Sequence, residues 1–246
     1  MPRFFIENVS GDAITVSGQD AAHISRSLRM KTGDTLTVCG GQGVDYLCVI
    51  ESVTDSEVFL RVTGTVPTTS EPSVRLTLYQ GLPKGDKLEL VIEKTVELGI
   101  HTIVPVLMQR SVSRPDAKAA TKKLERYRKL ALSAAKQCGR GIVPTVSPMI
   151  DFRELPGKLA SHQSVIFFYE CGGQPLSAVM DSVRREKLTD IAIVIGPEGG
   201  FAPAEAQALQ EAGAVTATLG RRILRTETAP IAATAAIMFA TGNMDT

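Results

Sequence analysis

Two loops of this chain carry residue types that could build a ligand site, and each follows an apolar strand-like run. The first loop is GPEGGF at residues 196–201, directly after IAIVI. Glycine-rich loops often hold phosphate on their backbone N–H groups. The spacing of Gly196, Gly199 and Gly200 fits neither the dinucleotide pattern nor the P-loop pattern, so another ligand or turn geometry alone must account for these glycines.

The second loop lies within TLGRRILRTETAP, residues 218–230. A polar run, Arg225 to Thr228, stands between Ile223–Leu224 and an alanine-rich helix, where the chain should be entering the core. Buried polar groups need hydrogen-bond partners. We therefore expect a site at this loop, or a subunit interface that completes one.

The elements that position these loops alternate from Val74 onward. Apolar strands VRLTLYQ, HTIVPVLM, SVIFFYE, DIAIVIG and AVTATLG are separated by helical stretches, which we predict at 87–98, 118–138, 176–185, 203–212 and 229–240. Strands without a polar face, alternating with helices, predict an α/β fold with a mainly parallel sheet covered on both sides. Ligands of such sheets bind beyond the carboxyl ends of the strands, where both loops fall.

The first 70 or so residues have a different sequence pattern from the rest of the chain. Short runs rich in β-branched and aromatic residues predict strands at 3–6, 13–16, 35–39, 46–50 and 58–62, with one helix after Asp20. This pattern favours a small β-barrel. The stretch TGTVPTTSEP, residues 63–72, has no hydrophobic period and is the expected linker, so we predict domains at 1–70 and 71–246.

Composition excludes several classes of protein. The chain has 246 residues, 43% of them hydrophobic, and a formal net charge of +1, which is typical of globular proteins. No apolar segment reaches the length of a membrane span, so we expect a cytoplasmic protein without a membrane partner. The four cysteines form no C-x-x-C pair and the three histidines are scattered, so we predict neither a disulfide framework nor a metal site.

Charge is concentrated in one segment. Residues 110–140 hold ten basic side chains and two acidic ones. Such a segment favours a polyanion as partner. The alternative is that it is the solvated face of a long helix.

Several motifs taken together resemble one known family. GPEGGF followed by a helix with Glu205, and then LGRRILRTETA, is similar to the C-terminal motifs of the RsmE family, SPOUT-class methyltransferases that use S-adenosylmethionine to make 3-methyluridine in 16S ribosomal RNA. KGDKLELVIEKTVELGI, QRSV and AAKQCGR resemble further blocks of the family, and HISRSLRMKTGD resembles its PUA-like RNA-binding barrel. The resemblance implies a PUA-like domain at 1–70 and, at 71–246, a SPOUT domain with a trefoil knot, active as a homodimer.

The resemblance also implies how the two loops act. Bare backbone suits a cofactor whose reactive end is a cation, because amides can bind the adenine while carbonyls lie near the sulfonium. The implied S-adenosylmethionine site consists of Ile195, Gly196, Gly199, Leu219, Gly220, Ile223 and Leu224.

The implied chemistry is methyl transfer to N3 of a uridine, which must lose its proton while the negative charge on the base is stabilised. Arg225 is our choice for orienting the uracil or stabilising its anion, because a guanidinium stays charged. Glu227 is a weaker choice as proton acceptor, the alternative being that it caps the helix or pairs with a basic side chain.

Contacts with 16S rRNA, within the small ribosomal subunit, are expected from basic side chains: Arg26, Arg29, Lys31, Arg110, Arg114, Lys136 and Arg140. Two positions depart from the family. Ala202 stands where serine is usual, which removes a helix cap, and Lys136 stands where glutamate is usual.

Two other functions stay open at this point. A SPOUT enzyme that methylates a ribose 2′-hydroxyl should carry an asparagine and arginine motif near the first strand of the second domain, which this chain lacks. A non-catalytic RNA-binding protein with the same fold should have a degraded cofactor loop, whereas GPEGGF is intact.

Overall fold

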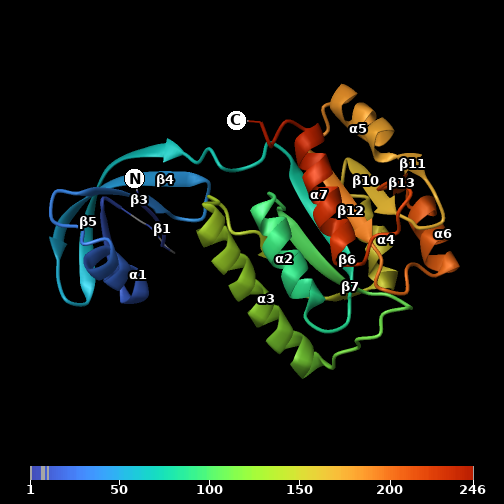
Figure 1. The fold of residues 1–246 in the computed structure, drawn as a ribbon, viewed down its shortest axis with the longest axis horizontal. Coiled ribbons are helices and arrows are strands. Elements are labelled where there is room, and N and C mark those ends of the chain that lie inside the picture. Colours follow the sequence, from blue (N-terminus) through green and yellow to red (C-terminus); the bar gives the residue numbers. More distant parts are fainter. Residues whose placement is uncertain (1, 7–8, 10, 246) are drawn as a thin grey trace. The chain divides into compact units, whose positions relative to one another are not determined.

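The structure, a computed structural model, describes residues 2–6, 9 and 11–245. The chain forms two compact units (Figure 1). Unit 1 consists of Met1–Glu71 together with Ala135–Val143, and unit 2 of Pro72–Ala134 together with Pro144–Thr246. The predicted boundary at 70/71 gave residues 135–143 to the second domain, whereas in the structure they pack with unit 1.

Unit 1 is built on a sheet of strand order β1-β3-β4-β5-β2, antiparallel except for the β1–β3 pair. Ile14 and Val16 point inward from the alternating strand β2, and they pack with Ile24, Leu36 and Val58 in a buried cluster. Its strands are β1 (Arg3–Phe5), β2 (Ala13–Ser17), β3 (Thr35–Cys39), β4 (Val44–Val53) and β5 (Glu57–Pro67).

Two sequence-based expectations for unit 1 need correction. The predicted linker begins too early, because β5 continues through Thr63–Pro67, paired with β4. The predicted helix after Asp20 is a short α1 (Gly18–Ala22) followed by a π-helical turn, η1 (His23–Ser27). Leu28 lies beyond the end of η1 and is 41% exposed.

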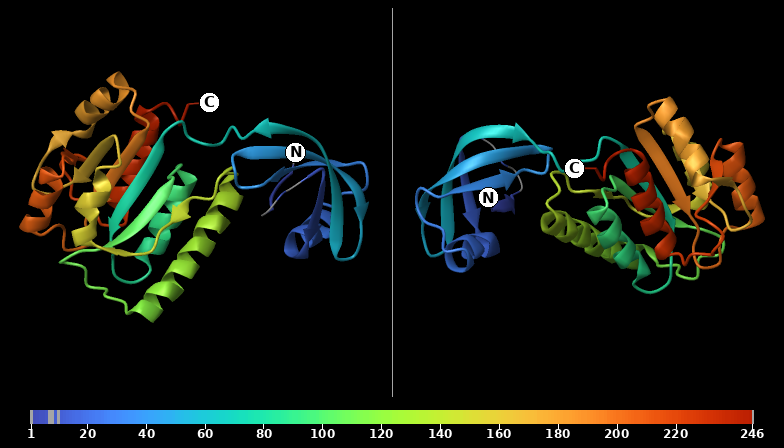
Figure 2. Two further views of the ribbon diagram at one scale, coloured as in Figure 1. Left: turned by 180° about the vertical axis from the view of Figure 1, so that it is seen from behind. Right: turned by 45° about the horizontal axis from the view of Figure 1, so that its top comes forward.

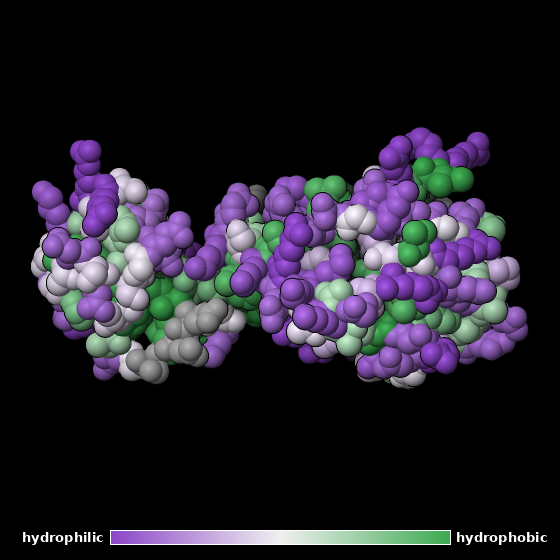
Figure 3. Space-filling view, turned by 90° about the horizontal axis from the view of Figure 1, so that it is seen from below, coloured by the Kyte–Doolittle hydropathy of each residue, from purple (hydrophilic) through white to green (hydrophobic). Residues whose placement is uncertain are grey.

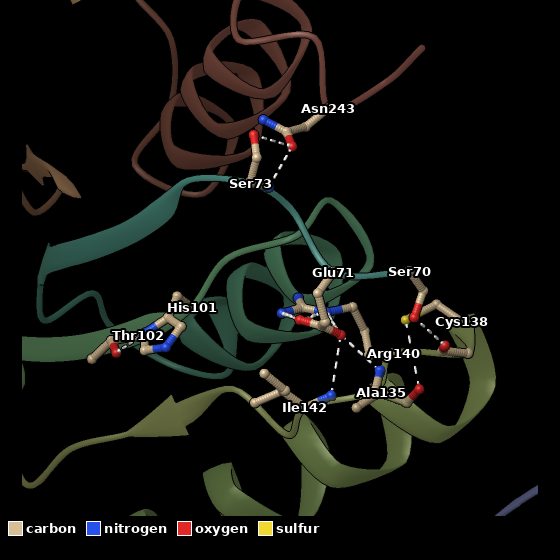
Figure 4. Close-up of polar contacts among 12 residues, drawn as sticks. Ser70, Glu71, Ser73, His101, Thr102, Ala135, Cys138, Arg140, Ile142 and Asn243 are labelled. Carbon is tan, nitrogen blue, oxygen red and sulfur yellow. Dashed lines mark hydrogen bonds and ion pairs between the residues drawn. The ribbon is translucent and has the colours of Figure 1, made fainter. Parts of the chain in front are cut away.

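A buried carboxylate explains why residues 135–143 belong to unit 1 (Figure 4). Both Glu71 oxygens accept hydrogen bonds from the Arg140 guanidinium, and Oε1 also accepts from the backbone N–H groups of Gly141 and Ile142, at 2.7 and 3.1 Å. The Arg140 side chain is 4% exposed. Charge-assisted bonds of this kind are stronger than neutral ones, and here they fasten the end of the linker to the chain after α3 (Ala117–Cys138).

Unit 2 is built on a parallel sheet of strand order β11-β13-β10-β12-β6-β7-β8, with β9 also paired to β7. Its central strands are buried on both faces, as their unbroken apolar sequences predict. The strands are β6 (Arg75–Gly81), β7 (Thr102–Leu107), β8 (Thr145–Val146), β9 (Ile150–Asp151), β10 (Ser164–Phe168), β11 (Gln174–Pro175), β12 (Asp190–Ile195) and β13 (Val215–Thr218).

Helices cover both faces of this sheet (Figure 2). On one face α4 (Leu155–Leu159) and α6 (Pro203–Glu211) pack on side chains such as Phe167 and Val194. On the other, α7 (Thr228–Ala240) contacts β6 and β12 and packs beside α2 (Lys87–Glu97). The remaining helices of unit 2 are η2 (Phe152–Glu154) and α5 (Leu176–Arg185), with most of α3. The α/β class and the parallel sheet are confirmed.

Two helix starts differ in detail from the sequence patterns. The spacing of Asp86 and Glu89 is that of a capping box, but Asp86 makes no side-chain cap hydrogen bond at the start of α2. At α6, Ala202 cannot cap with its side chain, but Glu205 accepts a hydrogen bond from the Ala202 N–H at 2.9 Å. Glu205 also accepts from the Gln109 N–H at 2.8 Å, which ties this helix start to the chain beyond β7.

Candidate functional site

A cavity of about 960 Å³ lies beyond the carboxyl ends of β10, β12 and β13. These three strands are neighbours in the sheet, so the loops that follow them meet at one edge. The two loops singled out in the sequence form much of the wall. The third loop, after β10, contributes Phe168, Tyr169 and Glu170.

The loop after β12 is close-packed backbone. Gly200 has a φ of +66°, in the left-handed region that favours glycine, and a Cβ there would collide with the Glu170 carboxylate. A Cβ on Gly199 would lie 2.9 Å from Cβ of Arg110, and one on Gly81 would lie 2.5 Å from Pro197 N. The positive φ of Gly200 and the close contacts at Gly81 and Gly199 therefore exclude side chains at these positions. Where Gly199 and Gly200 line the cavity, its wall consists of backbone atoms.

Thr226 joins the two loops. Its Oγ1 donates to the Gly196 carbonyl at 2.8 Å and accepts from Gln80 Nε2 at 3.1 Å. Thr226 is 6% exposed and Gln80 is fully buried. Hydrogen-bond partners were expected for the polar run from Arg225 to Thr228. For Thr226 they are the Gln80 side chain on β6 and the Gly196 carbonyl of the first loop. Gln80 Oε1 has no hydrogen-bond partner among the described residues.

Lys87, in the first turn of α2, carries a second link between the loops. Its Nζ lies 3.1 Å from Glu198 Oε1 and 3.1 Å from Glu227 Oε2. Hydrogen bonds to Glu198 and Glu227 raise the pKa of Lys87. Burial alone would raise the pKa of Glu227, but bonds from its own backbone N–H and from Lys87, with the charges of Lys87 and Arg225, lower it below its usual value. Glu227 thus pairs with a basic side chain, and its lowered pKa makes it a weaker proton acceptor.

Every residue predicted to bind the cofactor lines this cavity, and so does Arg225. They are Ile195, Gly196 and Gly199 from the first loop, and Leu219, Gly220, Ile223 and Leu224 from the second. Ile223 is 87% exposed, so within this chain its side chain is hardly covered. Glu227 lies behind the wall, against Lys87, which does line the cavity.

The residues predicted to contact RNA fall into three groups. Arg26, Arg29 and Lys31 are exposed around the end of η1 in unit 1. Lys136 is also exposed in unit 1, with its Nζ 3.5 Å from Asp20 in α1. Arg110 and Arg114 are exposed in unit 2. The prediction for Arg140 is corrected, because its guanidinium is buried against Glu71 and cannot meet a phosphate.

Arg110 supports a residue of the cavity wall, Gly199, as well as adding to the surface charge. Its Nη1 donates to the Gly199 carbonyl at 2.8 Å, and its stem packs on Gly199. Arg114 bonds the carbonyls of Met108 and Gln109, each at 3.1 Å, and so shapes the same turn. Both arginines therefore have structural partners in addition to any role in binding RNA.

Sequence reasoning missed the third loop and the two lysines, Lys84 and Lys87, that line the cavity. The third loop could have been found from the sequence, because the apolar run SVIFFYE is followed by a cysteine and two glycines. The strand before GPEGGF is likewise followed by a glycine-rich loop. The two lysines could not have been found in this way. They lie at or just before the start of α2, far from the loops in sequence, and nothing in the local sequence indicates that this helix start contacts the loops.

The described residues contain neither a metal-binding cluster nor a membrane-spanning helix. No group of three or more His, Cys, Asp or Glu side chains there could hold a metal ion. No helix in that part of the chain is both long and apolar enough to cross a membrane.

On the face drawn in Figure 3, hydrophilic residues cover most of the surface and hydrophobic ones form smaller patches.

Comparison with known proteins defines the class. Residues 70–238 match the model of an RNA methyltransferase domain, and residues 16–63 match that of an RNA methyltransferase PUA domain. The chain thus has the two domains of an RNA methyltransferase, and the cavity lies within the residues that match the methyltransferase domain.

Relatives narrow the class to one family. Ribosomal RNA small subunit methyltransferase E of Bacillus subtilis is 36% identical over 98% of this chain and 97% of its own, and that of Mycobacterium bovis is 30% identical over 98% and 93%. A crystal structure of the Neisseria gonorrhoeae enzyme bound to S-adenosyl methionine is 32% identical, covers 97% of both chains, and has a TM-score of 0.82. The chain belongs to the RsmE family of ribosomal RNA methyltransferases.

Proposed function

We propose that this protein uses S-adenosylmethionine to methylate N3 of a uridine in 16S rRNA of the small ribosomal subunit. The observation that carries the proposal is the meeting of the 195–200 and 219–226 loops around a single cavity of about 960 Å³. A cavity of this size is in the range of small-molecule sites. The family relationship supports ribosomal RNA as the substrate.

The residues of the cavity fit the cofactor. Gly220 has a φ of +96° and no atom within 4 Å of a Cβ position, so bare backbone faces open space there. Amides and carbonyls of the two loops are available to adenine and to a cation, and Ile195 and Leu224 supply apolar surface. When bound, S-adenosylmethionine supplies an electrophilic methyl group on a sulfonium.

Arg225 is the residue to which we assign stabilisation of the uracil anion. It is exposed, lines the cavity, and follows directly on the second loop. A guanidinium within reach of the base would stabilise the charge left when N3 loses its proton. Glu227 is held by Lys87, so we assign the N3 proton to solvent water rather than to that carboxylate.

Binding of the RNA is assigned to exposed basic side chains in each unit. Arg26, Arg29 and Lys31 serve in unit 1, with Lys136 beside them, and Arg110 and Arg114 serve in unit 2. Contacts of this kind release counterions, so affinity should fall steeply as salt rises. Binding that does not change with salt would contradict this assignment. With ribosomal RNA as substrate, the protein is expected to act in the cytoplasm.

A homodimer is proposed from the surface of α7. This helix is apolar almost all round, yet Ile231, Ala232 and Ala235 are only half-buried and Phe239, on the same face, is 69% exposed. A helix that is hydrophobic all round is normally buried. A second copy of the chain covering this face would bury it. The trefoil knot likewise remains a proposal, supported by membership of the family.

The test is transfer of labelled methyl groups from S-adenosylmethionine to small ribosomal subunits that lack their base methylations. Label recovered in 3-methyluridine supports the proposal. Label in a 2′-O-methyl nucleoside would keep the fold and overturn the mechanism. No label despite demonstrable RNA binding would refute the proposed substrate or activity.

A further inference from the structure

We propose that Lys87 is a positioning residue that fixes the separation of the two cavity loops by holding one carboxylate from each. This inference deepens the proposed function and rests on it for the identity of the ligand.

Lys87 and the two carboxylates, Glu198 and Glu227, form an ion-pair bridge between three separate parts of unit 2. Lys87 stands in the first turn of α2, Glu198 in the loop after β12, and Glu227 directly before α7. Nζ lies 3.1 Å from an oxygen of each carboxylate, so those two oxygens are within about 6 Å of each other. Side-chain exposures of 28, 23 and 17% show that the bridge is largely shielded from water.

Both carboxylates are held in the charged state. Burial alone would raise the pKa of Glu198, but its own backbone N–H, Lys87 and the Lys84 N–H, which donates at 3.2 Å, lower it. The pKa of Glu227 is lowered as well. Without Lys87 two neighbouring carboxylates would repel each other, and one of them would take up a proton more readily.

The bridge bears on the ligand cavity because of what its ends carry. Glu198 lies between Pro197 and Gly199, and Glu227 lies two residues after Arg225. The Thr226 hydrogen bond to Gly196 holds the inner side of the same pair of loops. The ion pairs of Lys87 and the hydrogen bond of Thr226 together fix the positions of the loop backbone and of Arg225.

Helix α2 offers a matched control. Lys94, in its last turn, also bridges two carboxylates, with Nζ 2.8 Å from Glu93 Oε1 and 2.8 Å from Glu97 Oε1. Lys94 does not line the cavity. Replacing Lys94 therefore removes the same kind of interaction from the same helix without touching the loops.

The first measurement is hydrogen exchange of residues 196–200 and 225–229 in the full chain without ligand. Lys87→Met should speed exchange in both loops by roughly tenfold relative to Lys94→Met, since an ion pair to each loop is lost. Lys87→Arg should restore protection. Equal exchange in Lys87→Met and Lys94→Met would overturn the proposal, whatever the ligand is.

The second measurement is calorimetric binding of S-adenosylmethionine between about pH 5 and pH 8. Relative to wild type, Lys87→Met should bind roughly tenfold more weakly at pH 8 and recover as pH falls, because protonation of Glu198 or Glu227 relieves their repulsion. The charged groups that act on this pair are Lys87 and Arg225, and the Lys84 backbone N–H also donates to Glu198. A ratio of dissociation constants that does not change with pH would contradict the repulsion.

A double variant, Lys87→Met with Glu198→Gln, separates repulsion from loss of packing. It leaves a single carboxylate without a like-charged neighbour, so the dissociation constant should lose its extra pH dependence. If it keeps that dependence, the repulsion is refuted. If wild type does not bind S-adenosylmethionine at all, the proposed function fails, while hydrogen exchange still decides the role of Lys87.

Discussion

Thr226 donates a hydrogen bond to the Gly196 carbonyl at 2.8 Å, which links loops 30 residues apart in the sequence. The same hydroxyl accepts from Gln80 on β6, so three elements meet at one buried oxygen. A single side chain thereby sets the spacing of the walls of the cavity from within.

Removing that hydroxyl should destabilise the protein. Thr226→Val keeps the shape of the side chain but leaves the Gln80 amide and the Gly196 carbonyl without this partner, at a cost of about 1–3 kcal/mol. Urea unfolding should show a lower midpoint, and calorimetry a weaker affinity for S-adenosylmethionine. Thr234→Val is the control, because Thr234 is buried in α7 but bonds back to Pro230 in its own helix. Equal effects of the two changes would argue against a special role for Thr226.

Arg225→Ala should abolish methyl transfer while cofactor affinity stays within about twofold. Loss of a group that stabilises charge in the transition state typically costs about 10²–10³ in rate. Single-turnover methylation and calorimetric titration with S-adenosylmethionine separate the two effects. Arg153→Ala, at a side chain that is 89% exposed, serves as the control. An Arg225→Ala enzyme with near-normal turnover would sink the assignment.

Phe239→Glu should shift the protein from dimer to monomer. A carboxylate in the apolar face of α7 would have to lose its water on association, which is unfavourable without a partner charge. Sedimentation equilibrium of the variant should give the mass of one chain, while wild type gives twice that mass. Val66→Glu, at an apolar residue of unit 1 that is 41% exposed, should leave the mass unchanged. A wild-type monomer would refute the proposed homodimer.

Glu71→Gln should destabilise the protein by about 3 kcal/mol, because it leaves the buried Arg140 charge uncompensated. Burial alone would raise the pKa of Glu71, but hydrogen bonds and charge from Arg140 and bonds from the Gly141 and Ile142 amides lower it. A lowered folded-state pKa means that this stabilisation is present above the unfolded pKa and is lost as pH falls through the folded pKa.

The difference in unfolding free energy between wild type and Glu71→Gln should therefore be constant near neutral pH and shrink below about pH 4.5. Urea titrations at several pH values measure it. Glu51→Gln is the matched control, because its partner Arg61 is 56% exposed, and such a surface pair contributes at most about 1 kcal/mol. A difference that does not change with pH would contradict the assignment to the Glu71 carboxylate.

Much of the fold followed from local sequence. The apolar runs that became β6, β7, β10 and β12 lacked a polar face, which implied a parallel sheet covered on both sides. Helix α5 occupies the predicted residues, and the predicted limits of α6 and α7 differ from the observed ones by one residue each. These features depend on periodicity and on turn residues, which are properties of neighbours along the chain.

The two principal loops could likewise be chosen from sequence, because a glycine-rich or polar run at the end of an apolar strand indicates a tight turn or a ligand. The partners of those loops could not. Gln80, Lys87 and Arg110 meet them only after the strands have been ordered in the sheet. The same holds for Arg140, whose charge indicated an RNA contact until folding brought Glu71 beside it. Which segments become strands, helices and ligand loops depends on local propensity and periodicity, so these features could be predicted from the sequence. Tertiary structure alone decided which charges are buried, paired or left facing the cavity, because desolvation and ion pairing depend on groups far apart in the chain.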